Sequence, residues 1–361
     1  MKICTIIGAR PQFIKAATVS RAIKNYPGVQ EIILHTGQHF DSNMSDVFFS
    51  ELDIPEPNYH LGVGGGSHGT QTGKMLERID EILIQNKPDW VLVYGDTNST
   101  LAGALSASKL HFPIAHVEAG LRSFNKRMPE EINRILTDHV STVLFTPTET
   151  AVKNLTKEGI PLERIYNIGD VMYDAALFYG HKAEKGSNIL ASLDLKPEDF
   201  ILATIHRAEN TDDPQRLKLI FDALEKVSKA FKVVLPLHPR TKESLSKLNF
   251  NFNSTNICFI PPLGYLDMVK LEKNAKIIVT DSGGVQKEAY FHRRTCVTLR
   301  EETEWIELVT GGFNILASNL EEVESKIMFA INNSYLFDSN LNLFGAGNAA
   351  EKIVDNLINH G

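Results

Sequence analysis

The chain contains the stretch Thr280-Asp281-Ser282-Gly283-Gly284-Val285-Gln286-Lys287-Glu288-Ala289, which follows an apolar, strand-like run at 276–279. After the two glycines the pattern becomes helical and continues to about His292. Adjacent glycines let a backbone approach a ligand closely, and a helix that begins there presents unpaired N–H groups and the positive end of its dipole. Phosphate commonly binds at such a helix start. The stretch therefore predicts one half of a phosphate-binding site, with an ordinary tight turn as the alternative interpretation.

The same alternation of strand and helix runs through the whole chain. Its strand-like segments are apolar on both faces, which is typical of parallel sheets covered by helices. They lie at 3–7, 31–35, 90–94, 113–117 and 143–145 in the first half, and at 201–205, 233–237, 257–260, 276–279 and 295–299 in the second. We therefore expect the α/β class, with two doubly wound, Rossmann-like domains.

The length of the chain agrees with two domains. Its 361 residues are more than a single hydrophobic core usually organises. Its composition, 43% hydrophobic and 22% charged, is that of an ordinary globular protein. The chain turns polar between Gly180 and Asp199, and we place the domain boundary in this region or slightly before it. The expected domains are 1–170 and 171–344, and a helix within 345–361 is expected to pack back on the first domain.

Charge and composition exclude several classes of partner. A net charge of −7 and a pI near 6.0 provide no electrostatic attraction for nucleic acid or an anionic membrane. No apolar stretch approaches the roughly 18 residues of a membrane span, and the first apolar run is too short for a signal peptide. Cys4, Cys258 and Cys296 each lie inside an apolar run, as buried free thiols do in a reducing compartment. We expect a cytoplasmic protein.

Polar side chains gather directly after the predicted strands. Ligands of parallel sheets bind beyond the carboxyl ends of the strands, so these side chains are candidates for one site. They are Arg10, Gln38, His39, Asp96 and Glu118 in the first half, and His206, Arg207, Glu209, Asn210, His238, Arg240, Asp281 and Ser282 in the second. If the two sets of strand ends face each other, these groups converge on one cleft between the domains.

Three carboxylates, Asp96, Glu118 and Glu131, come from successive strand-end segments of the first half. Grouped carboxylates suit abstraction of a proton from carbon, and Arg10 with Lys15 can neutralise a diphosphate leaving group. Helix caps, surface charges and a solvated helix start are the alternative interpretations. Glu131 lies in the first turn of a helix whose buried face is predicted to be Ile132, Ile135, Leu136, His139 and Val140.

Several well-known motifs are missing from the sequence. It has no Gly-Lys-Ser/Thr phosphate loop, and no Gly-x-Gly-x-x-Gly directly follows a predicted strand, which disfavours ATP and nicotinamide cofactors. His116-Val117-Glu118 resembles the His-x-Glu of zinc deaminases, but no Pro-Cys-x-x-Cys accompanies it. No Gly-x-Ser-x-Gly elbow is present. We expect neither a metal site nor esterase chemistry.

The motifs taken together resemble the non-hydrolysing UDP-N-acetylglucosamine 2-epimerases from residue 1 to about 350. They are Gly8-Ala9-Arg10-Pro11 with Lys15, Thr36-Gly37-Gln38-His39, Gly95-Asp96-Thr97, His116-Val117-Glu118-Ala119-Gly120-Leu121-Arg122, Pro129-Glu130-Glu131-Ile132-Asn133-Arg134, His206-Arg207-Ala208-Glu209-Asn210, His238-Pro239, and Asp281-Ser282-Gly283-Gly284 with Glu288. The resemblance implies a two-domain fold of the glycosyltransferase-B, glycogen phosphorylase-like type. It implies an isomerase that removes the C2 proton of a UDP-sugar, expels UDP to leave a glycal and adds UDP back. No cofactor is implied.

The resemblance also implies a role for each matching residue. The implied catalytic residues are Asp96, Glu118, Glu131 and His206. The implied UDP-binding residues are Arg10, Lys15, His238, Ser282, Gly283, Gly284 and Glu288, with Glu288 holding the ribose hydroxyls. The remaining motif residues are implied to contact substrate or to regulate, and they are Gln38, His39, Arg122, Arg134, Arg207 and Asn210.

The chain departs from the commonest family members at three places. It has Ala9-Arg10-Pro11-Gln12 for Thr-Arg-Pro-Glu, Phe40-Asp41 for a polar and basic pair, and no arginine between 65 and 75. In typical bacterial members of the family, those positions help bind a second, activating UDP-GlcNAc. Because this chain differs there, the resemblance does not imply that regulation. The full set is more similar to the UDP-2,3-diacetamido-2,3-dideoxy-glucuronate 2-epimerase subgroup, which serves surface polysaccharide and lipopolysaccharide synthesis.

The expected partners are a UDP-sugar, UDP and a second copy of the chain in a homodimer. Three alternatives stay open at this point: a glycosyltransferase on the same fold, a hydrolysing 2-epimerase that releases UDP and free sugar, and a non-catalytic sensor of sugar nucleotides. A glycosyltransferase needs one base, so three grouped carboxylates disfavour it.

Overall fold

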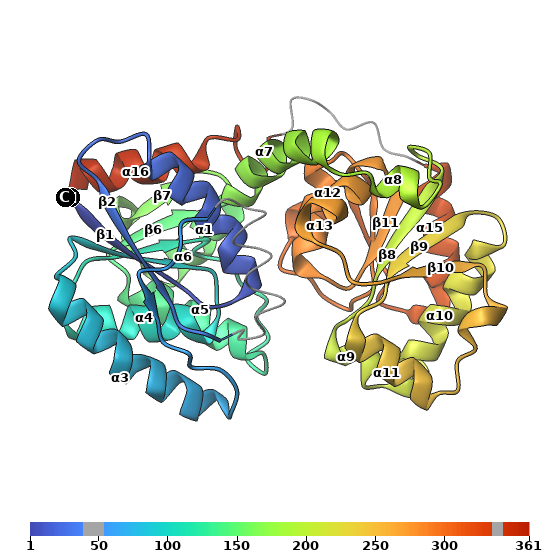
Figure 1. Cartoon of the computed structure of the whole chain (residues 1–361), viewed down its shortest axis with the longest axis horizontal. Coiled ribbons are helices and arrows are strands. Elements are labelled where there is room, and N and C mark those ends of the chain that lie inside the picture. Colours follow the sequence, from blue (N-terminus) through green and yellow to red (C-terminus); the bar gives the residue numbers. More distant parts are fainter. Residues whose placement is uncertain (39–53, 334–341, 361) are drawn as a thin grey trace. The chain divides into compact units, whose positions relative to one another are not determined.

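The computed structural model describes residues 1–38, 54–333 and 342–360, without the side chain of Arg10. It divides into two compact units. Unit 1 comprises Met1–Ala175 and Asn342–Gly361, and unit 2 comprises Ala176–Leu341. Each unit is a parallel sheet with helices on both faces (Figure 1). The prediction of two doubly wound α/β domains is therefore confirmed.

The sheet of unit 1 has the order β3-β2-β1-β4-β5-β6-β7, and every pairing is parallel. Its strands are β1 Lys2–Ile7, β2 Gln30–His35, β3 Tyr59–His60, β4 Trp90–Tyr94, β5 Ile114–Val117, β6 Val143–Thr146 and β7 Ile165–Asn167. Its helices are α1 Arg10–Ile23, α3 His68–Asn86, α4 Asn98–Lys109, α5 Pro129–Val140, α6 Glu149–Lys157, the 3₁₀ turn η1 Leu162–Arg164, and α16 Ala349–His360. Helices α1 and α16 cover one face, and α3, α4 and α5 cover the other (Figure 1).

The sheet of unit 2 has the order β10-β9-β8-β11-β12-β13 and is also parallel. Its strands are β8 Phe200–Thr204, β9 Lys232–Pro236, β10 Ile257–Ile260, β11 Ile277–Thr280, β12 Cys296–Thr298 and β13 Asn314–Leu316. Its helices are α8 Ile189–Ser192, α9 Ala208–Thr211, α10 Pro214–Ser228, α11 Pro239–Lys247, α12 Tyr265–Asn274, α13 Gly283–Phe291, α14 Ile306–Thr310 and α15 Val323–Asn332, with 3₁₀ turns η2 Phe252–Ser254 and η3 Leu320–Glu322. Helix α7 Val171–Gly186 begins in unit 1 and ends in unit 2. Across the described ranges, no helix is both long and apolar enough to cross a membrane.

Helix α16 closes the chain against unit 1. It contacts α1, and the hydroxyl of Tyr26, three residues after α1, donates a 2.8 Å hydrogen bond to Asp355. The backbone N–H of Ala350, in the first turn of α16, donates a 2.8 Å hydrogen bond to the carboxylate of Asp174 on α7. Because the first N–H groups of a helix lack partners within it, Asp174 stabilises the start of α16.

The carboxyl group of Asp174 should make the stability of the protein depend on pH. Burial, only partly offset by backbone hydrogen bonds from Ala350 and Ala349, raises the pKa of Asp174 from 3.8 to about 6. The native state therefore binds this proton more tightly than the unfolded state does, and the free energy of unfolding falls as pH rises from about 4 to about 6. An Asp174→Asn variant keeps an acceptor for Ala350 and should lose this dependence.

The expected difference is an Asn variant that is more stable than the wild type at pH 8, by at most about 3 kcal/mol, and not at pH 4. Urea unfolding of both proteins at the two pH values measures it. An Asn variant that is less stable at pH 8 would contradict the account.

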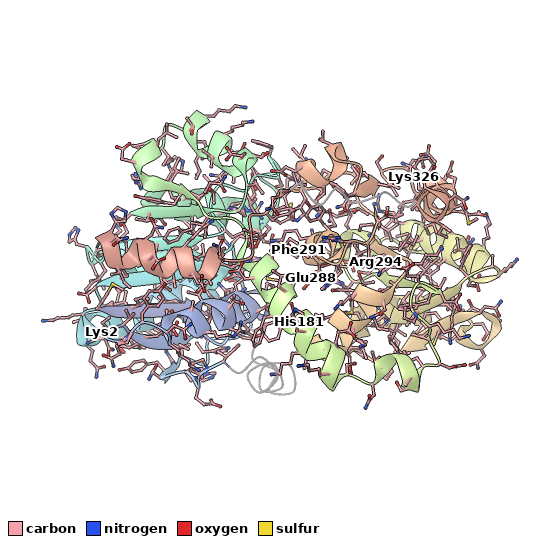
Figure 2. The ribbon with its side chains drawn as sticks, turned by 90° about the horizontal axis from the view of Figure 1, so that it is seen from above. Lys2, His181, Glu288, Phe291, Arg294 and Lys326 are labelled. Carbon is pink, nitrogen blue, oxygen red and sulfur yellow. The ribbon has the colours of Figure 1, made fainter. Side chains whose placement is uncertain are left out.

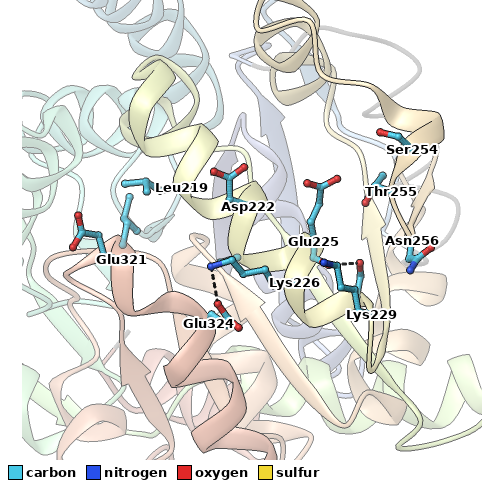
Figure 3. Close-up of a pocket in the computed structure, with 13 residues that line it drawn as sticks. Leu219, Asp222, Glu225, Lys226, Lys229, Ser254, Thr255, Asn256, Glu321 and Glu324 are labelled. Carbon is cyan, nitrogen blue, oxygen red and sulfur yellow. Dashed lines mark hydrogen bonds and ion pairs between the residues drawn. The ribbon is translucent and has the colours of Figure 1, made fainter.

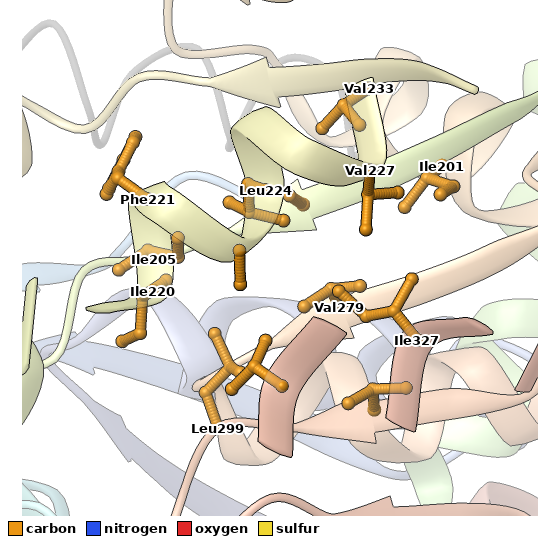
Figure 4. Close-up of a cluster of buried hydrophobic side chains, with 14 of the residues drawn as sticks. Ile201, Ile205, Ile220, Phe221, Leu224, Val227, Val233, Val279, Leu299 and Ile327 are labelled. Atoms are coloured by element: carbon orange, nitrogen blue, oxygen red, sulfur yellow. The ribbon is translucent and has the colours of Figure 1, made fainter. Parts of the chain in front are cut away.

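Helix α10 shows how unit 2 is built. Its inner side packs on the sheet together with α15, in a core of branched aliphatic side chains and Phe221 (Figure 4). That core includes Leu217, Ile220, Leu224, Val227, Val279, Leu299 and Ile327. Its outer side lines a pocket of about 460 Å³, where Lys226 pairs with Glu324 at 3.0 Å (Figure 3). The pocket also contacts residues directly before β10, so it lies toward the amino end of that strand.

Helix α5 packs with the opposite face from the one expected. Ile132 and Leu136 are 46% and 44% exposed, whereas the buried residues are Glu131, Asn133, Arg134, Thr137 and Asp138. The predicted apolar buried face is therefore wrong. Its physical cause is hydrogen bonding, because polar side chains of α5 bind groups at the ends of β4 and β5.

Candidate active site

Asp96 and Glu118 follow neighbouring parallel strands of unit 1, β4 and β5. Both turns need unusual backbone, since Gly95 has φ +64° and Glu118 has φ +72°. A Cβ on Gly95 would lie 3.3 Å from both the Glu118 carboxylate and the Lys15 ammonium group. Both its conformation and its surroundings favour a glycine there. The turn that carries Asp96 therefore lies directly against Glu118.

Each of these carboxylates has a cation beside it. Lys15, on α1, forms an ion pair with Glu118, and both side chains are at least nine-tenths buried. Arg134, on α5, bonds Asp96 through Nη2 and Glu131 through Nη1, the second at 2.7 Å. The structure thus brings together all three predicted catalytic carboxylates of unit 1 with Lys15 and Arg134. Such an arrangement keeps several carboxylates close without leaving their charge uncompensated.

Glu131 is 1% exposed and is held by several hydrogen-bond donors. These donors are Arg134, the Ser123 N–H at 3.0 Å, the Ser123 hydroxyl at 3.1 Å and the Phe124 N–H at 2.9 Å. Its oxygens are therefore engaged by the 123–124 loop and by Arg134. This geometry favours a role in positioning Arg134, and its predicted part in proton transfer stays a prediction.

The remaining predicted residues of unit 1 differ in what they contact. The Gln38 side chain accepts hydrogen bonds from the Ser99 N–H and hydroxyl, at 3.0 and 2.8 Å, at the start of α4. Arg122 is buried and bonds Glu158 with two nitrogens at 2.7 Å each and Asp138 with the third at 2.7 Å, so its guanidinium is directed to these two carboxylates and not to Asp96 or Glu118. His39 and the side chain of Arg10 lie outside the described part of the chain.

In unit 2, Asp281 organises the turn after β8. It follows β11, which pairs with β8, and it is fully buried. Its carboxylate accepts the N–H groups of His206 and Arg207, at 3.1 and 3.0 Å, and the Asn210 side chain at 3.1 Å. The His206 ring stays 42% exposed, with Nδ1 3.7 Å from Asp281. Asp281 therefore fixes the backbone of His206 while leaving its ring accessible.

His238 joins this group from the end of β9. Its Nδ1 accepts the N–H of Arg240 at 3.2 Å, and its ring centre lies 5.7 Å from that of His206. Because Nδ1 is an acceptor, a neutral His238 carries its proton on Nε2. The structure thus places both predicted histidines side by side at the carboxyl edge of the sheet.

The stretch from Thr280 to Ala289 contains the helix start that its sequence predicts. Ser282 is the N-cap of α13, with its hydroxyl accepting the Val285 N–H at 3.5 Å. A Cβ on Gly283 would lie 2.7 Å from Glu304 and 3.5 Å from Arg207, whereas one on Gly284 would meet nothing closer than 3.9 Å. A side chain at Gly283 would have to displace the carboxylate end of Glu304, whereas Gly284 leaves its side of the helix start open. An anion approaching there meets the N–H groups of the first helical turn.

Glu288 lies farther along α13, one turn before Phe291 (Figure 2). It is buried, and the Tyr265 hydroxyl on α12 donates to it at 3.4 Å. Burial, together with the charge of Glu288, raises the pKa of Tyr265 well above its ordinary value. Tyr265 therefore stays a hydrogen-bond donor to Glu288.

The pocket beside α10 includes none of the predicted site residues in its lining. It lies toward the amino end of β10, whereas ligands of such sheets bind at the carboxyl ends. The described residues also contain no group of three or more His, Cys, Asp or Glu side chains placed to hold a metal ion. The carboxyl edges of the two sheets are therefore the candidate sites.

Comparison with known proteins shows which family this geometry belongs to. The family model for UDP-N-acetylglucosamine 2-epimerase matches residues 21–358. The chain belongs to the UDP-N-acetylglucosamine 2-epimerase family. A 2-epimerase relative from Pseudomonas aeruginosa, UDP-2,3-diacetamido-2,3-dideoxy-D-glucuronate 2-epimerase, is 52% identical over 99% of both chains.

Two archaeal members of the 2-epimerase family are similarly related. A UDP-N-acetylglucosamine 2-epimerase homolog from Methanococcus maripaludis is 54% identical, covering 99% of this chain and all of that protein. The UDP-GlcNAc 2-epimerase of Methanocaldococcus jannaschii, solved in complex with UDP-GlcNAc and UDP, is 44% identical over the full length of both chains, with a TM-score of 0.90. The family predicted from the motifs is therefore confirmed.

Some residues that shape the site of this 2-epimerase family member were not predicted. The Gln12 side chain accepts the N–H groups of Gly8 and Ala9, at 2.8 and 3.0 Å, and donates to the Tyr94 carbonyl at 3.0 Å. It ties the turn after β1 to the end of β4. Its position one residue after the Gly8-Ala9-Arg10-Pro11 motif was the available signal. Asp138 was also missed, and nothing in the local sequence distinguishes it.

Proposed function

We propose that this protein inverts C2 of a UDP-2-acetamido sugar without net hydrolysis, through loss and re-addition of UDP. The observation that carries the proposal is the group of Asp96, Glu118 and Glu131 with Lys15 and Arg134 at the carboxyl ends of β4 and β5. Carboxylates of this kind serve as general base and acid. The adjacent cations stabilise negative charge on the leaving group.

The reaction balances with no added reagent. A carboxylate removes the C2 proton, the C1–C2 double bond forms from that electron pair, and the C1–oxygen bond breaks with its electrons on UDP. A second side chain, acting as an acid, then delivers a proton to the opposite face of C2, and a UDP oxygen adds back to C1. We assign Asp96 and Glu118 to the two proton transfers, because they follow adjacent strands and Gly95 allows them to approach. His206 completes the proposed catalytic set.

The proposed UDP-binding residues are largely those of unit 2. The helix start at Ser282, Gly283 and Gly284 suits the diphosphate, and Glu288, held by Tyr265, suits the ribose hydroxyls. Arg207 adds a donor beside that helix start, and His238 adds one beside His206. Arg10 and Lys15 are proposed to contact the diphosphate as well. Gln38, His39, Arg134 and Asn210 are proposed to contact the sugar or to position groups that do.

Ser282→Ala should weaken UDP binding and leave the chemistry nearly unchanged. Loss of one neutral hydrogen bond costs about 1 kcal/mol, or roughly fivefold in affinity, and more if the hydroxyl contacts a phosphate. Calorimetric titration with UDP, beside kcat, measures both. Because Ser282 also caps α13, the denaturation midpoint of the variant should fall as well. An unchanged UDP affinity would remove Ser282 from the proposed site.

The substrate we favour is UDP-2,3-diacetamido-2,3-dideoxy-glucuronate, in a pathway of surface polysaccharide synthesis. The 52% identity to the Pseudomonas aeruginosa enzyme of that name supports this choice. Assaying it beside UDP-GlcNAc at equal concentrations tests it, with the C2 epimer resolved by NMR. We expect a kcat/KM at least about 100-fold higher for the diacetamido uronic acid. A preference for UDP-GlcNAc would contradict the substrate assignment and not the reaction.

A coupled assay for released UDP separates this proposal from a hydrolysing 2-epimerase. The proposed enzyme releases no stoichiometric UDP while the epimer accumulates. We also propose a cytoplasmic homodimer. A net charge of −7, which does not favour binding to an anionic membrane, supports the cytoplasmic location. Light scattering of the purified protein measures its mass, and a monomeric mass at micromolar concentration would contradict the dimer.

A further inference from the structure

His116, on β5, lies between two hydrogen-bond acceptors and is fully buried. Its Nδ1 is 2.7 Å from Asp138 Oδ1, and its Nε2 is 2.7 Å from the carbonyl oxygen of Gly95. A carbonyl oxygen and a carboxylate can only accept, so each ring nitrogen must donate. A histidine that donates from both nitrogens is an imidazolium. The geometry therefore assigns a buried positive charge to His116.

The neighbouring charges agree with that assignment. Asp138 Oδ2 accepts the N–H of Gly120 at 3.1 Å and pairs with Arg122 Nη1 at 2.7 Å. Arg122 in turn bonds both oxygens of Glu158. With His116 protonated, the group holds two cations and two anions, so its buried charges compensate each other. Burial alone would raise the pKa of Asp138, but the hydrogen bonds and charges of His116 and Arg122 outweigh it and lower that pKa.

This group reaches the turns of both proposed catalytic carboxylates. The Gly95 carbonyl belongs to the peptide that leads into Asp96. Gly120 lies two residues after Glu118 in the same turn. Both residues have a positive φ, +81° for Gly120 and +72° for Glu118. A non-glycine residue in that conformation costs energy that the surroundings must supply. The same buried charges therefore anchor both turns.

We propose that His116 is a positioning residue for the epimerisation: with Asp138 and Arg122, its imidazolium holds the Asp96 and Glu118 turns in reactive register. The proposal rests on the proposed function of those two carboxylates. The two ring nitrogens of His116 bond Asp138 and the Gly95 carbonyl, so it acts on Asp96 through that carbonyl. Arg122, predicted to contact substrate or regulate, is assigned to this positioning group as well.

Two substitutions of His116 separate its two hydrogen bonds. The amide nitrogen of Gln can replace Nε2 and donate to Gly95, whereas that of Asn can replace Nδ1 and donate to Asp138. Both remove the charge, and the Asn side chain is one methylene shorter than that of Gln, so the denaturation midpoint of each variant is measured beside its kcat. Since a misplacement of about 1 Å can cost roughly 100-fold in rate, His116→Asn should lose about 100-fold in kcat and His116→Gln about tenfold. KM and UDP affinity should stay within about threefold for both.

Equal kcat losses in the two variants, in proportion to their lowered denaturation midpoints, would overturn the positioning role and leave a structural one. A fall in UDP affinity would overturn it too. Glu158→Gln, at the far end of the group, is the control for stability, and its kcat should fall least.

The protonation of His116 is measured independently of activity. Long-range ¹H–¹⁵N NMR of the wild-type protein, under the conditions of the activity assay, should show two protonated nitrogens for His116, with the assignment made by its loss in His116→Gln. One unprotonated nitrogen would overturn the imidazolium even if all variants lose activity. A wild-type protein without epimerase activity but with an imidazolium would refute the proposed function and not the charge assignment.

Discussion

Asp96→Asn and Glu118→Gln should each lower kcat by about 1000-fold, within the range that general acid–base catalysis supplies. Both substitutions preserve shape. In the native protein Asp96 contacts Arg134 and Glu118 contacts Lys15. The introduced asparagine and glutamine each keep an oxygen for the same cation. The variants therefore lose proton transfer and not the surrounding arrangement. UDP affinity should stay within about threefold of the wild type, since the diphosphate is assigned to other residues.

Glu130→Gln is the matched control for these two variants. Glu130 is exposed in the first turn of α5, directly beside Glu131. The substitution removes the same charge near the site from a residue outside the proposed machinery, so kcat should change by less than about twofold. Steady-state kinetics with UDP titrations measures all three variants. If Asp96→Asn or Glu118→Gln kept a tenth of the wild-type kcat, that residue would not transfer the proton.

Asp281→Asn should lower kcat by about 100-fold or more, because it disturbs the backbone on which His206 is mounted. The native carboxylate is buried and accepts hydrogen bonds from His206, Arg207 and Asn210. An amide oxygen in the place of Oδ2 still accepts from all three, but the NH₂ group then takes the place of Oδ1, 3.1 Å from the His206 N–H. Hydrogen bonds to a charged group contribute about 1.5–3 kcal/mol and neutral ones about 1 kcal/mol, so loss of the charge weakens all three. The denaturation midpoint of unit 2 should fall accordingly.

Asp222→Asn provides the comparison for Asp281→Asn. Asp222 lies on the outer side of α10 and pairs with Lys218 at 2.9 Å, and both side chains are largely exposed. Removing that pair should change stability by less than about 1 kcal/mol and leave kcat unchanged. Urea unfolding and kcat measured on the same preparations decide between the roles. An Asp281→Asn protein with a lowered midpoint and the full kcat would show that Asp281 serves folding alone.

The strands were predictable because their burial is nearly complete. The run at 90–94 became β4, in which all five residues are buried, and 201–205 overlaps β8, Phe200–Thr204. A strand that is covered on both faces has to be apolar throughout, and that signal is local. The carboxyl ends of parallel strands lie at one edge of a sheet. Prediction of the strands was therefore enough to predict that Asp96 and Glu118 lie near each other.

The partners of those carboxylates were not predictable from local sequence. Arg134 reaches both Asp96 and Glu131, and the contact with Asp96 spans 38 positions. It depends on α5 turning its polar face inward, against its own amphipathic pattern. Ile132 and Leu136 are exposed because Asp138 and Arg134 find charged and hydrogen-bonding partners on the sheet. Helical periodicity counts apolar side chains and is blind to such pairings.

His116 illustrates the same limit. Its sequence neighbours suggested only a resemblance to the His-x-Glu of zinc deaminases, without the cysteines that would complete it. The structure shows what the sequence pattern could not, namely two acceptors at 2.7 Å on opposite sides of one ring. The Gly95 carbonyl that His116 contacts belongs to a residue with a positive φ. The sequence shows only that this residue is a glycine, not which conformation it adopts.

Epimerisation of the UDP-sugar in D₂O tests the central claim most directly. Breaking the C2–H bond and returning a proton from solvent should place one deuterium at C2 of the epimer, visible by NMR as loss of the C2 proton signal. The recovered substrate should also acquire deuterium as the reaction approaches equilibrium, while free UDP does not accumulate. An epimer that retains its original C2 hydrogen would contradict the account.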